Sequence, residues 1–340
     1  MRKKWLDRPF GFLLTFLSLI FFVFAIVVIR DVSTILSLTH LTIPDIYSIV
    51  TSRGDSLKME NGRTNILLLG SGGGTHEGSD LTDTIIIFSY SHVLKSTSLI
   101  SVPRDIWSET LKDKINTAYH YGEEKKVGGG YAMARSIITE VTGIPLHYTV
   151  SVEFSGFKTV VNTVGGIDVY TGEGFKDPLY PIEGKENDLC NGDPSFACRY
   201  TTAVFIKGIE HMDGDRALMY VRSRHADGTE GTDFARSKRQ QEVLAALKTK
   251  MFDPGFWYSL ESVKNVYTSI DMAVNTDMMM REVGILAKLL ILTQKTDVEK
   301  LNFEDLLIQP LEYLYGGRYV LMPRDGTFRE IQSYLQKKLP

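Results

Sequence analysis

The sequence predicts an α/β fold with helices on both faces of the sheet, preceded by one N-terminal transmembrane helix. First, residues 10–29 form a run without a single charged side chain. Second, between residues 65 and 170 short apolar runs typical of buried strands alternate with segments of helical periodicity, as in α/β proteins. Third, no linker separates residues 251–340 from what precedes them. We therefore expect residues 62–340 to form one domain.

The composition is that of an ordinary globular protein. Of the 340 residues, 43% are hydrophobic and 23% are charged. The net charge of -3 argues against a broad nucleic-acid-binding surface. Two cysteines, Cys190 and Cys198, are too few for a disulfide scaffold, and no Cys/His spacing is typical of a zinc site.

The N-terminus is predicted to anchor the protein in the cell membrane. Residues 1–9 are basic, and the apolar run that follows is long enough to cross a hydrocarbon core of roughly 30 Å as a helix. A buried soluble helix and a cleaved signal peptide are the alternatives, but the run is long and no A-x-A site follows it. By the positive-inside rule, residues 1–9 are a cytoplasmic tail, 10–30 a single-pass anchor, 31–61 a stalk and 62–340 an extracytoplasmic domain.

Within that domain, hydrophobic periodicity predicts the regular elements. Strands are expected at residues 65–69, 85–88, 98–102, 148–152, 167–170 and 319–322. Helices are expected at residues 131–141, 154–164, 283–292 and 328–335. Residues 171–215 are polar and expected to be irregular, and both cysteines lie there. Outside the cytoplasm Cys190 and Cys198 form either a disulfide that closes a small loop or two free thiols.

Polar residues gather where the first predicted strands end. A glycine-rich turn at residues 70–74 is either a phosphate cradle or a plain flexible loop. Asp80 and Asp83 lead into the second strand, where carboxylates suit Mg²⁺, and loop capping is an equal alternative for each. The third strand stops at Arg104 and Asp105, and Lys114 follows. Ligands bind beyond strand ends in α/β sheets, so we expect a ligand site there.

The stretch around which the chain is organised is residues 218–244. Residues 218–221 read as a short buried strand, after which Arg222 and Arg224 are two apart and point the same way. A helix is expected from residue 234, with Arg236, Arg239 and Gln240 at i, i+3 and i+4 on one face. This arrangement predicts a pocket for phosphate or pyrophosphate. The alternative is a solvated basic helix face.

An ordered set of motifs resembles the LytR-CpsA-Psr family over about residues 62–250. The motifs are NILLLG, LTDT, SVPRD, KINTAY, GGIDV, ALMYVRSR and DFARSKRQQ. The resemblance implies a three-layer α/β/α sandwich with a central mixed sheet and a deep apolar pocket for a lipid tail. It implies a cell-wall transferase that moves a glycopolymer from a polyprenyl pyrophosphate carrier to peptidoglycan, with Mg²⁺ assisting.

The resemblance also implies roles for individual residues. Asp83 matches an aspartate linked to Mg²⁺, and Arg104 matches the catalytic arginine. The residues expected to bind pyrophosphate are Arg222, Arg224, Arg236, Arg239, Gln240 and Lys114, and Asp233 matches the start of the last motif. Gly72 and Leu81 replace an aspartate and an arginine that many members have, so Asp80 and His76 are the candidates to compensate.

Two other classes of function remain open. A phosphohydrolase would release the lipid-linked polymer to water, because water and a sugar hydroxyl are similar nucleophiles. A membrane-anchored regulator or scaffold would bind lipid-linked sugars without turnover. The carboxylate and arginine set argues against a pure scaffold, and the lack of a helix-turn-helix pattern or basic face argues against a nucleic-acid partner.

Overall fold

The computed structural model describes residue 31 and residues 33–73, 78–185, 187–251, 253, 259–293 and 298–339. The predicted cytoplasmic tail and membrane anchor lie outside the described residues, as does His76. None of the described helices is long and apolar enough to cross a bilayer.

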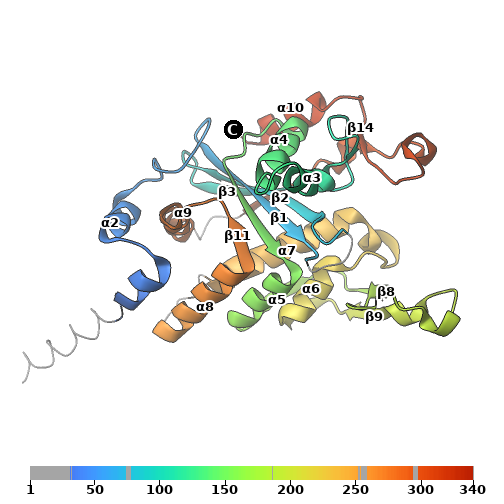
Figure 1. Ribbon diagram of the computed structural model, residues 1–340, viewed down its shortest axis with the longest axis horizontal. Coiled ribbons are helices and arrows are strands. Elements are labelled where there is room, and N and C mark those ends of the chain that lie inside the picture. Colours follow the sequence, from blue (N-terminus) through green and yellow to red (C-terminus); the bar gives the residue numbers. More distant parts are fainter. Residues whose placement is uncertain are drawn as a thin grey trace, which may run out of the picture.

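A mixed sheet forms the centre of the domain (Figure 1). In spatial order its strands are β11 (Val274–Thr276), β6 (Tyr148–Glu153), β1 (Arg63–Ser71), β2 (Thr82–Ser91), β3 (Ser96–Ser101) and β12 (Val298–Leu301). The pairs β1–β6 and β3–β12 are parallel, whereas β1–β2, β2–β3 and β6–β11 are antiparallel. The predicted central mixed sheet is therefore confirmed.

One face of the sheet is covered by helices that lie above it in Figure 1. These helices are α3 (Ala118–Lys125), α4 (Gly130–Thr142) and α10 (Arg329–Lys338). Leu67 and Leu69 of β1 pack with Ile137 of α4 and Ile331 of α10 in one buried cluster. Alternate residues of a strand point to opposite faces, so the residues between these leucines point to the other layer.

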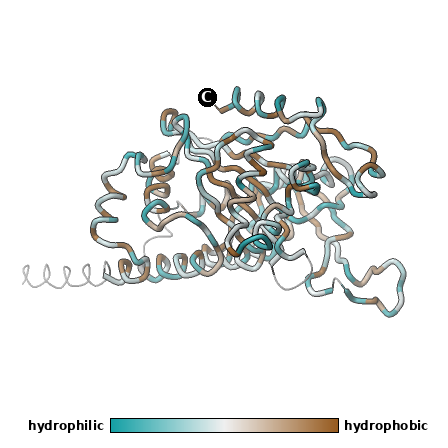
Figure 2. Tube along the Cα trace, turned by 45° about the horizontal axis from the view of Figure 1, so that its top comes forward, coloured by the Kyte–Doolittle hydropathy of each residue, from teal (hydrophilic) through white to brown (hydrophobic). Residues whose placement is uncertain are grey.

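The second face is covered by helices from the middle and the later part of the chain. They are α5 (Phe154–Thr163), α6 (Gly214–Arg222), α7 (Asp233–Met251), α8 (Leu260–Ala273) and α9 (Met280–Leu292). Ile66 and Leu68 of β1 pack with Leu286 of α9. The Gln241 amide of α7 donates to Ser101 Oγ at 2.9 Å and so ties this helix to β3. Apolar stretches gather along the central strands (Figure 2), between the two helical layers.

The residues predicted as a stalk include a helix, α2 (Ile43–Thr51), that packs on the domain. Thr42 and Asp45 form a capping box at its start, and Pro44 occupies the first turn, where proline is favoured. Ile49 packs beside Ile285 and Leu289 of α9. The boundary at residue 61 remains a prediction, but part of the stalk touches the domain.

The prediction that residues 171–215 are irregular is wrong. They contain the hairpin of β8 (Phe175–Pro181) and β9 (Tyr200–Phe205), and β10 (Gly208–Met212) pairs with β7 (Ile167–Thr171). Cys190 and Cys198 are disulfide-bonded in the loop between β8 and β9. The polar composition hid these strands because two-stranded ribbons on the surface have little apolar patterning.

Two other predicted strands are wrong. Residues 218–221 belong to α6, which begins where Asp213 Oδ1 accepts the Arg216 amide at 2.8 Å. A four-residue apolar run does not distinguish a buried strand from a buried helix turn. Of residues 319–322, only Met322 lies in a strand, β14 (Met322–Pro323), which pairs with β13 (Leu307–Ile308). The remaining short pair is β4 (Trp107–Ser108) with β5 (Asp113–Lys114).

Candidate functional site

A polar pocket of about 180 Å³ opens where β1 ends and β2 begins. It is lined by Asp83, Thr84, Arg104, Phe154, Pro181, Val221, Arg222, Arg224, His225, Arg236 and Gln240. Four of these residues are arginines, and Asp83 is the only carboxylate among them. Six segments of the chain therefore build one cationic site.

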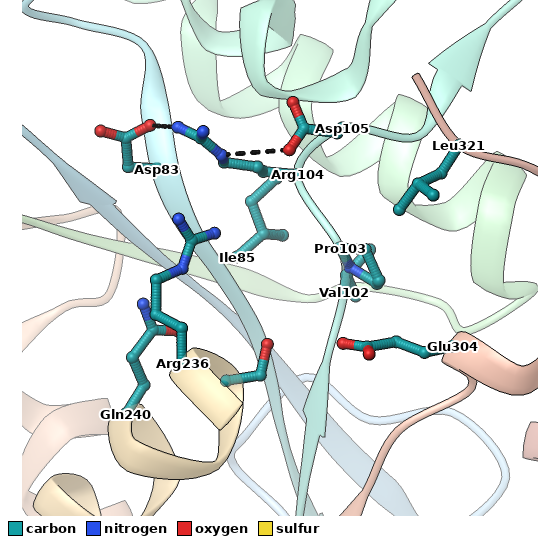
Figure 3. A pocket seen from close by; sticks show the side chains of 11 residues that line it. Asp83, Ile85, Val102, Pro103, Arg104, Asp105, Arg236, Gln240, Glu304 and Leu321 are labelled. Carbon is teal, nitrogen blue, oxygen red and sulfur yellow. Dashed lines mark hydrogen bonds and ion pairs between the residues drawn. The ribbon is translucent and has the colours of Figure 1, made fainter. Parts of the chain in front are cut away.

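Arg104 is the centre of a chain of opposite charges (Figure 3). Its Nη1 donates to Asp83 Oδ1, and its Nε lies 3.3 Å from Asp105 Oδ2. The other Asp105 oxygen accepts Lys114 Nζ at 2.7 Å. Asp105 is almost fully buried, so it fixes the Arg104 guanidinium at the pocket wall. Lys114 forms an ion pair with Asp105 and does not line the polar pocket.

Arg222 and Arg224 reach the pocket from the end of α6, not from a strand. The Arg222 guanidinium lies over the Phe154 ring, 4.6 Å from its centroid, and 5.8 Å from the Tyr180 centroid. Burial raises the pKa of the Tyr180 hydroxyl, although Arg222 opposes this shift, so the ring presents a neutral aromatic surface to the cation. The two arginines therefore line one pocket from the last residue of a helix and the turn after it, and not from an extended strand.

The segment after α6 is fixed by a buried carboxyl group from β8. Asp177 Oδ2 accepts the Arg224 amide at 2.9 Å and the His225 amide at 3.3 Å, and Oδ1 accepts the Leu179 amide at 3.0 Å. Asp177 is fully buried. It therefore sets where the backbone of Arg224 lies.

Helix α7 supplies two of its three predicted residues to the pocket. Arg236 and Gln240 line it, and Gln240 Nε2 donates to Thr84 Oγ1 at 2.9 Å. The structure places Arg239 elsewhere, buried under the Phe175 ring. Successive helix residues are about 100° apart, and here Arg239 is turned toward the backbone of Tyr220 and Ser223, whereas Gln240 is turned toward Thr84. The Asp233 side chain lies outside the described part of the structure.

The Arg239 guanidinium is bonded to the backbone of the arginine-bearing segment. It donates to the carbonyl oxygens of Tyr220 at 3.0 Å, Ser223 at 2.6 Å and Glu230 at 3.0 Å, and it pairs with the Glu230 carboxylate. These bonds use donors on all three of its nitrogens. Arg239 therefore positions Arg222 and Arg224 and does not share their pocket.

The two predicted metal ligands, Asp80 and Asp83, have different partners. Asp80 Oδ2 lies 2.6 Å from His120 Nδ1, and this hydrogen bond raises the pKa of His120. Asp80 does not line the polar pocket, whereas Asp83 does. In the described residues, one group of three or more potential metal ligands converges, Asp188 with the two cysteines. Because those cysteines are bonded to each other, they are not available as thiolate ligands.

An apolar channel of about 290 Å³ adjoins the polar pocket. The two share Thr84, Phe154, Val221 and Gln240. The channel runs between the second face of the sheet and helices α5, α6 and α7, with Leu68, Ile86, Val150, Phe157, Val243, Leu244 and Leu247 among its lining. Such a site fits an amphiphile with an anionic head and an apolar tail.

Sequence reasoning missed Phe154, Thr84 and Asp177 as parts of this site. Thr84 directly follows Asp83 in the LTDT motif, so the prediction of Asp83 as a site residue could have pointed to Thr84 as well. Phe154 begins a helix and reads as an ordinary core residue. Asp177 lies in a polar stretch where nothing marks its burial.

Comparison with known proteins gives a consistent set of relatives. The model of the LytR_cpsA_psr family matches residues 45–337. The chain is 30% identical over 219 residues to a polyisoprenyl-teichoic acid–peptidoglycan teichoic acid transferase, TagU of Bacillus cereus, which covers 63% of this chain and 60% of the relative. It is 26% identical over 269 residues to TagV of Bacillus subtilis, covering 76% of this chain and 60% of the relative. The matches therefore span less than two thirds of the length of these curated relatives.

Solved structures share the fold. The crystal structure of Bacillus subtilis TagV superposes with a TM-score of 0.58 at 24% identity, covering 83% of this chain and 98% of that one. A structure of TagT bound to LI-WTA superposes with a TM-score of 0.55 at 20% identity, covering 84% of this chain and 95% of that one.

Proposed function

This chain belongs to the LytR-CpsA-Psr family, and we propose that it is a membrane-anchored transferase that moves a glycopolymer from a polyprenyl pyrophosphate carrier to peptidoglycan. The observation that carries the proposal is the joined site, in which a pocket with four arginines opens into an apolar channel. A polyprenyl pyrophosphate has the matching halves, a doubly anionic head and a long apolar tail. The names of TagU and TagV support the same class of donor and acceptor.

In this proposal the arginines neutralise the charge of the pyrophosphate. Arg104, Arg222, Arg224 and Arg236 approach from three segments, and guanidinium groups grip phosphate oxygens bidentately. An acceptor hydroxyl of peptidoglycan attacks the phosphorus next to the sugar, and its proton is taken up by the leaving phosphate. The bond from that phosphorus to the bridging oxygen breaks, and polyprenyl phosphate leaves. Phosphoryl transfer needs mainly positioning and charge stabilisation, which these residues supply.

The lining residues divide this work between head and tail. Asp83 and Asp105 hold Arg104 from two sides, so its guanidinium needs little reorganisation when substrate binds. Gln240 and Thr84, bonded to each other, lie where head and tail meet. The apolar channel shields the first isoprene units from water.

Mg²⁺ is part of the proposal, with Asp83 as the residue that would hold it. Mg²⁺ on phosphates commonly uses one or two carboxylates together with phosphate and water oxygens. The single partly exposed carboxylate of the polar pocket fits this donor set. The ion would supply further charge neutralisation on the phosphate oxygens. Asp80, whose Oδ2 is bonded to His120, does not line the polar pocket and is not part of this donor set.

The proposal is tested by turnover of the full chain in detergent micelles. The substrate is a short polyprenyl pyrophosphate glycan with Mg²⁺, offered with and without peptidoglycan fragments. Release of polyprenyl phosphate together with attachment of the glycan to the fragments is the expected result. Release without attachment would favour the phosphohydrolase, and binding without release would favour the regulator or scaffold.

A variant of Arg104 links this activity to the site. Arg104→Ala should lower kcat/KM by about a hundredfold or more, because one preorganised charge-stabilising group is typically worth that much. The matched control is Arg324→Ala, which removes an exposed arginine paired with Glu330 outside the pocket. Near-normal turnover by Arg104→Ala, with both variants folded by circular dichroism, would refute the role of Arg104.

A further inference from the structure

Helix α2 carries a stripe of exposed apolar side chains on the side that faces away from the domain. Ile43, Ile46, Tyr47 and Val50 are spaced i, i+3, i+4 and i+7, so they share one helix face. Ile43 is 75%, Tyr47 71% and Val50 68% exposed. In a soluble protein such a stripe normally faces the core, so its exposure here indicates a surface that another molecule covers.

The stripe is held in place from the opposite side of α2. Ile49 packs in the cluster of Ile285 and Leu289. It also lies against Gly284 of α9 so closely that a Cβ at Gly284 would be 2.6 Å from Ile49 Cδ1. Lys288 Nζ donates to Val50 O at 3.1 Å and also to Ser52 O, and so caps the end of α2. The domain therefore fixes which way the stripe points.

Helix α9 extends this apolar surface. Ile291 and Leu292 are exposed, and they follow Lys288 by three and four residues. Residues with that spacing lie on the same side of a helix, one turn further on. We refer to Ile43, Ile46, Tyr47, Val50, Ile291 and Leu292 as the α2–α9 surface.

We propose that the α2–α9 surface rests in the interfacial layer of a lipid bilayer. The charge-free run of residues 10–29 ends fourteen positions before Ile43. Fourteen residues span about 21 Å as a helix and about 46 Å when extended, so a bilayer crossed by that run lies within reach of α2. An amphipathic helix with Ile, Val and Tyr on one face suits the headgroup and acyl boundary. The proposal thus rests on the predicted anchor.

A second copy of the chain is a weaker candidate for the occupant. Stable protein interfaces use roughly 20–30 residues a side, and the α2–α9 surface has six. Lipid needs no complementary shape and accepts a narrow stripe. The small size of the surface therefore favours lipid.

This placement orients the site. Helices α2 and α9 pack at the end of the sheet where β1 starts, in one cluster with Leu57 and Tyr90. Gly70 and Thr84, at the other end of the sheet, lie beside the polar pocket. The nine residues of β1 separate the two ends by about 30 Å. Figure 1 shows α2 at one end of the long axis and the β8–β9 hairpin at the other. The polar pocket would then face away from the lipid, with the apolar channel between.

A label at Tyr47 tests the proposal in the full chain reconstituted in vesicles of phosphatidylcholine and phosphatidylglycerol. Both native cysteines are disulfide-bonded, so Tyr47→Cys provides a unique thiol for an environment-sensitive fluorophore. Vesicles with a nitroxide near the headgroup should lower its emission about twofold, because an interfacial helix lies within the first 5–10 Å of the boundary. Leu292→Cys should respond in the same way.

The matched control is Tyr313→Cys, which is as exposed (74%) but lies in the 3₁₀ turn Glu312–Tyr315 near β14. Its label should not respond to the nitroxide. Equal quenching at positions 47 and 313, or no quenching at 47, overturns the proposal. So does emission that changes only when labelled chain is diluted with unlabelled chain, which would mean a second copy covers the surface. Because no substrate is present, the result is independent of the proposed transfer.

Discussion

Asp177 accepts a hydrogen bond from the backbone amide of Arg224 at 2.9 Å, across 47 positions of the sequence. The carboxyl group comes from β8 and the amide from the turn after α6. On the other side of the same turn, Arg239 donates to the carbonyl oxygens of Tyr220 and Ser223. Two buried ionisable side chains that do not line the polar pocket thus hold the segment that carries two of its arginines.

Replacing Asp177 should loosen that segment. Asp177→Ala leaves the amides of Leu179, Arg224 and His225 without their acceptor, and a buried donor without a partner costs about 1–3 kcal/mol. We expect a loss of at least ~2 kcal/mol in the free energy of unfolding and a higher KM for the donor. Asp177→Asn keeps one acceptor oxygen and should lie between wild type and alanine. Urea denaturation and donor KM test this, and wild-type values for both in Asp177→Ala would contradict it.

Arg239 should matter to stability far more than its neighbour on α7. Arg239→Met leaves the buried carbonyls and Glu230 without their cation, and breaking such a buried pair costs about 3–5 kcal/mol. Lys238→Met is the control, because Lys238 is exposed and only loosely paired with Glu242 at 3.9 Å. Its effect should stay within ~0.5 kcal/mol. Equal urea midpoints for the two variants would show that Arg239 holds nothing in place.

The apolar channel should set the preference for the length of the lipid. Leu244→Trp narrows the channel beyond the polar pocket. Each isoprene methylene that loses burial costs about 0.8 kcal/mol, so displacing about two methylenes should raise KM for a long-chain donor about tenfold. A donor with one or two isoprene units should be turned over as before. Val93→Trp, at an exposed position outside the channel, is the matched control. An equal loss for short and long donors would mean that the tail lies elsewhere.

The pKa of His120 depends on its hydrogen bond with Asp80. The hydrogen bond that His120 donates to Asp80 raises the pKa of His120 above its usual 6.5, so the pair stabilises the fold below pH 6.5 and this contribution is lost as pH rises through the raised pKa. Both side chains are partly exposed, so the contribution is below ~1 kcal/mol. Nuclear magnetic resonance titration should show the pKa of His120 falling in Asp80→Asn.

The same titration separates the two candidate metal ligands. If Asp83 holds Mg²⁺ and Asp80 does not, adding Mg²⁺ with a pyrophosphate should leave the pKa of His120 unchanged. A metal on Asp80 would compete with His120 for the carboxylate and lower that pKa. A clear fall would therefore restore Asp80 as a ligand.

Local sequence patterns were enough to predict the central elements and most of the cationic site. β1, β2, β6, α4 and α5 follow from apolar runs and helical spacing, because a strand or helix is specified mainly by neighbours within a few residues. Arg104, Arg222, Arg224, Arg236 and Gln240 were expected to share a ligand, and the structure brings them to one pocket.

The positions of the remaining groups depend on contacts between elements that are far apart in the sequence. Arg239 and Gln240 are adjacent in sequence, yet one holds a backbone turn and the other lines the pocket, because their side chains are turned about 100° from each other and meet different packed elements. Asp80 is hydrogen-bonded to His120, 40 positions away in the sequence, whereas Asp83 is paired with Arg104. Residues 218–221 became helix because Asp213 caps α6 before them. Leu244 and its neighbours line a channel instead of filling a core, since a cavity depends on how far apart the packed layers stand, and no local pattern records that distance.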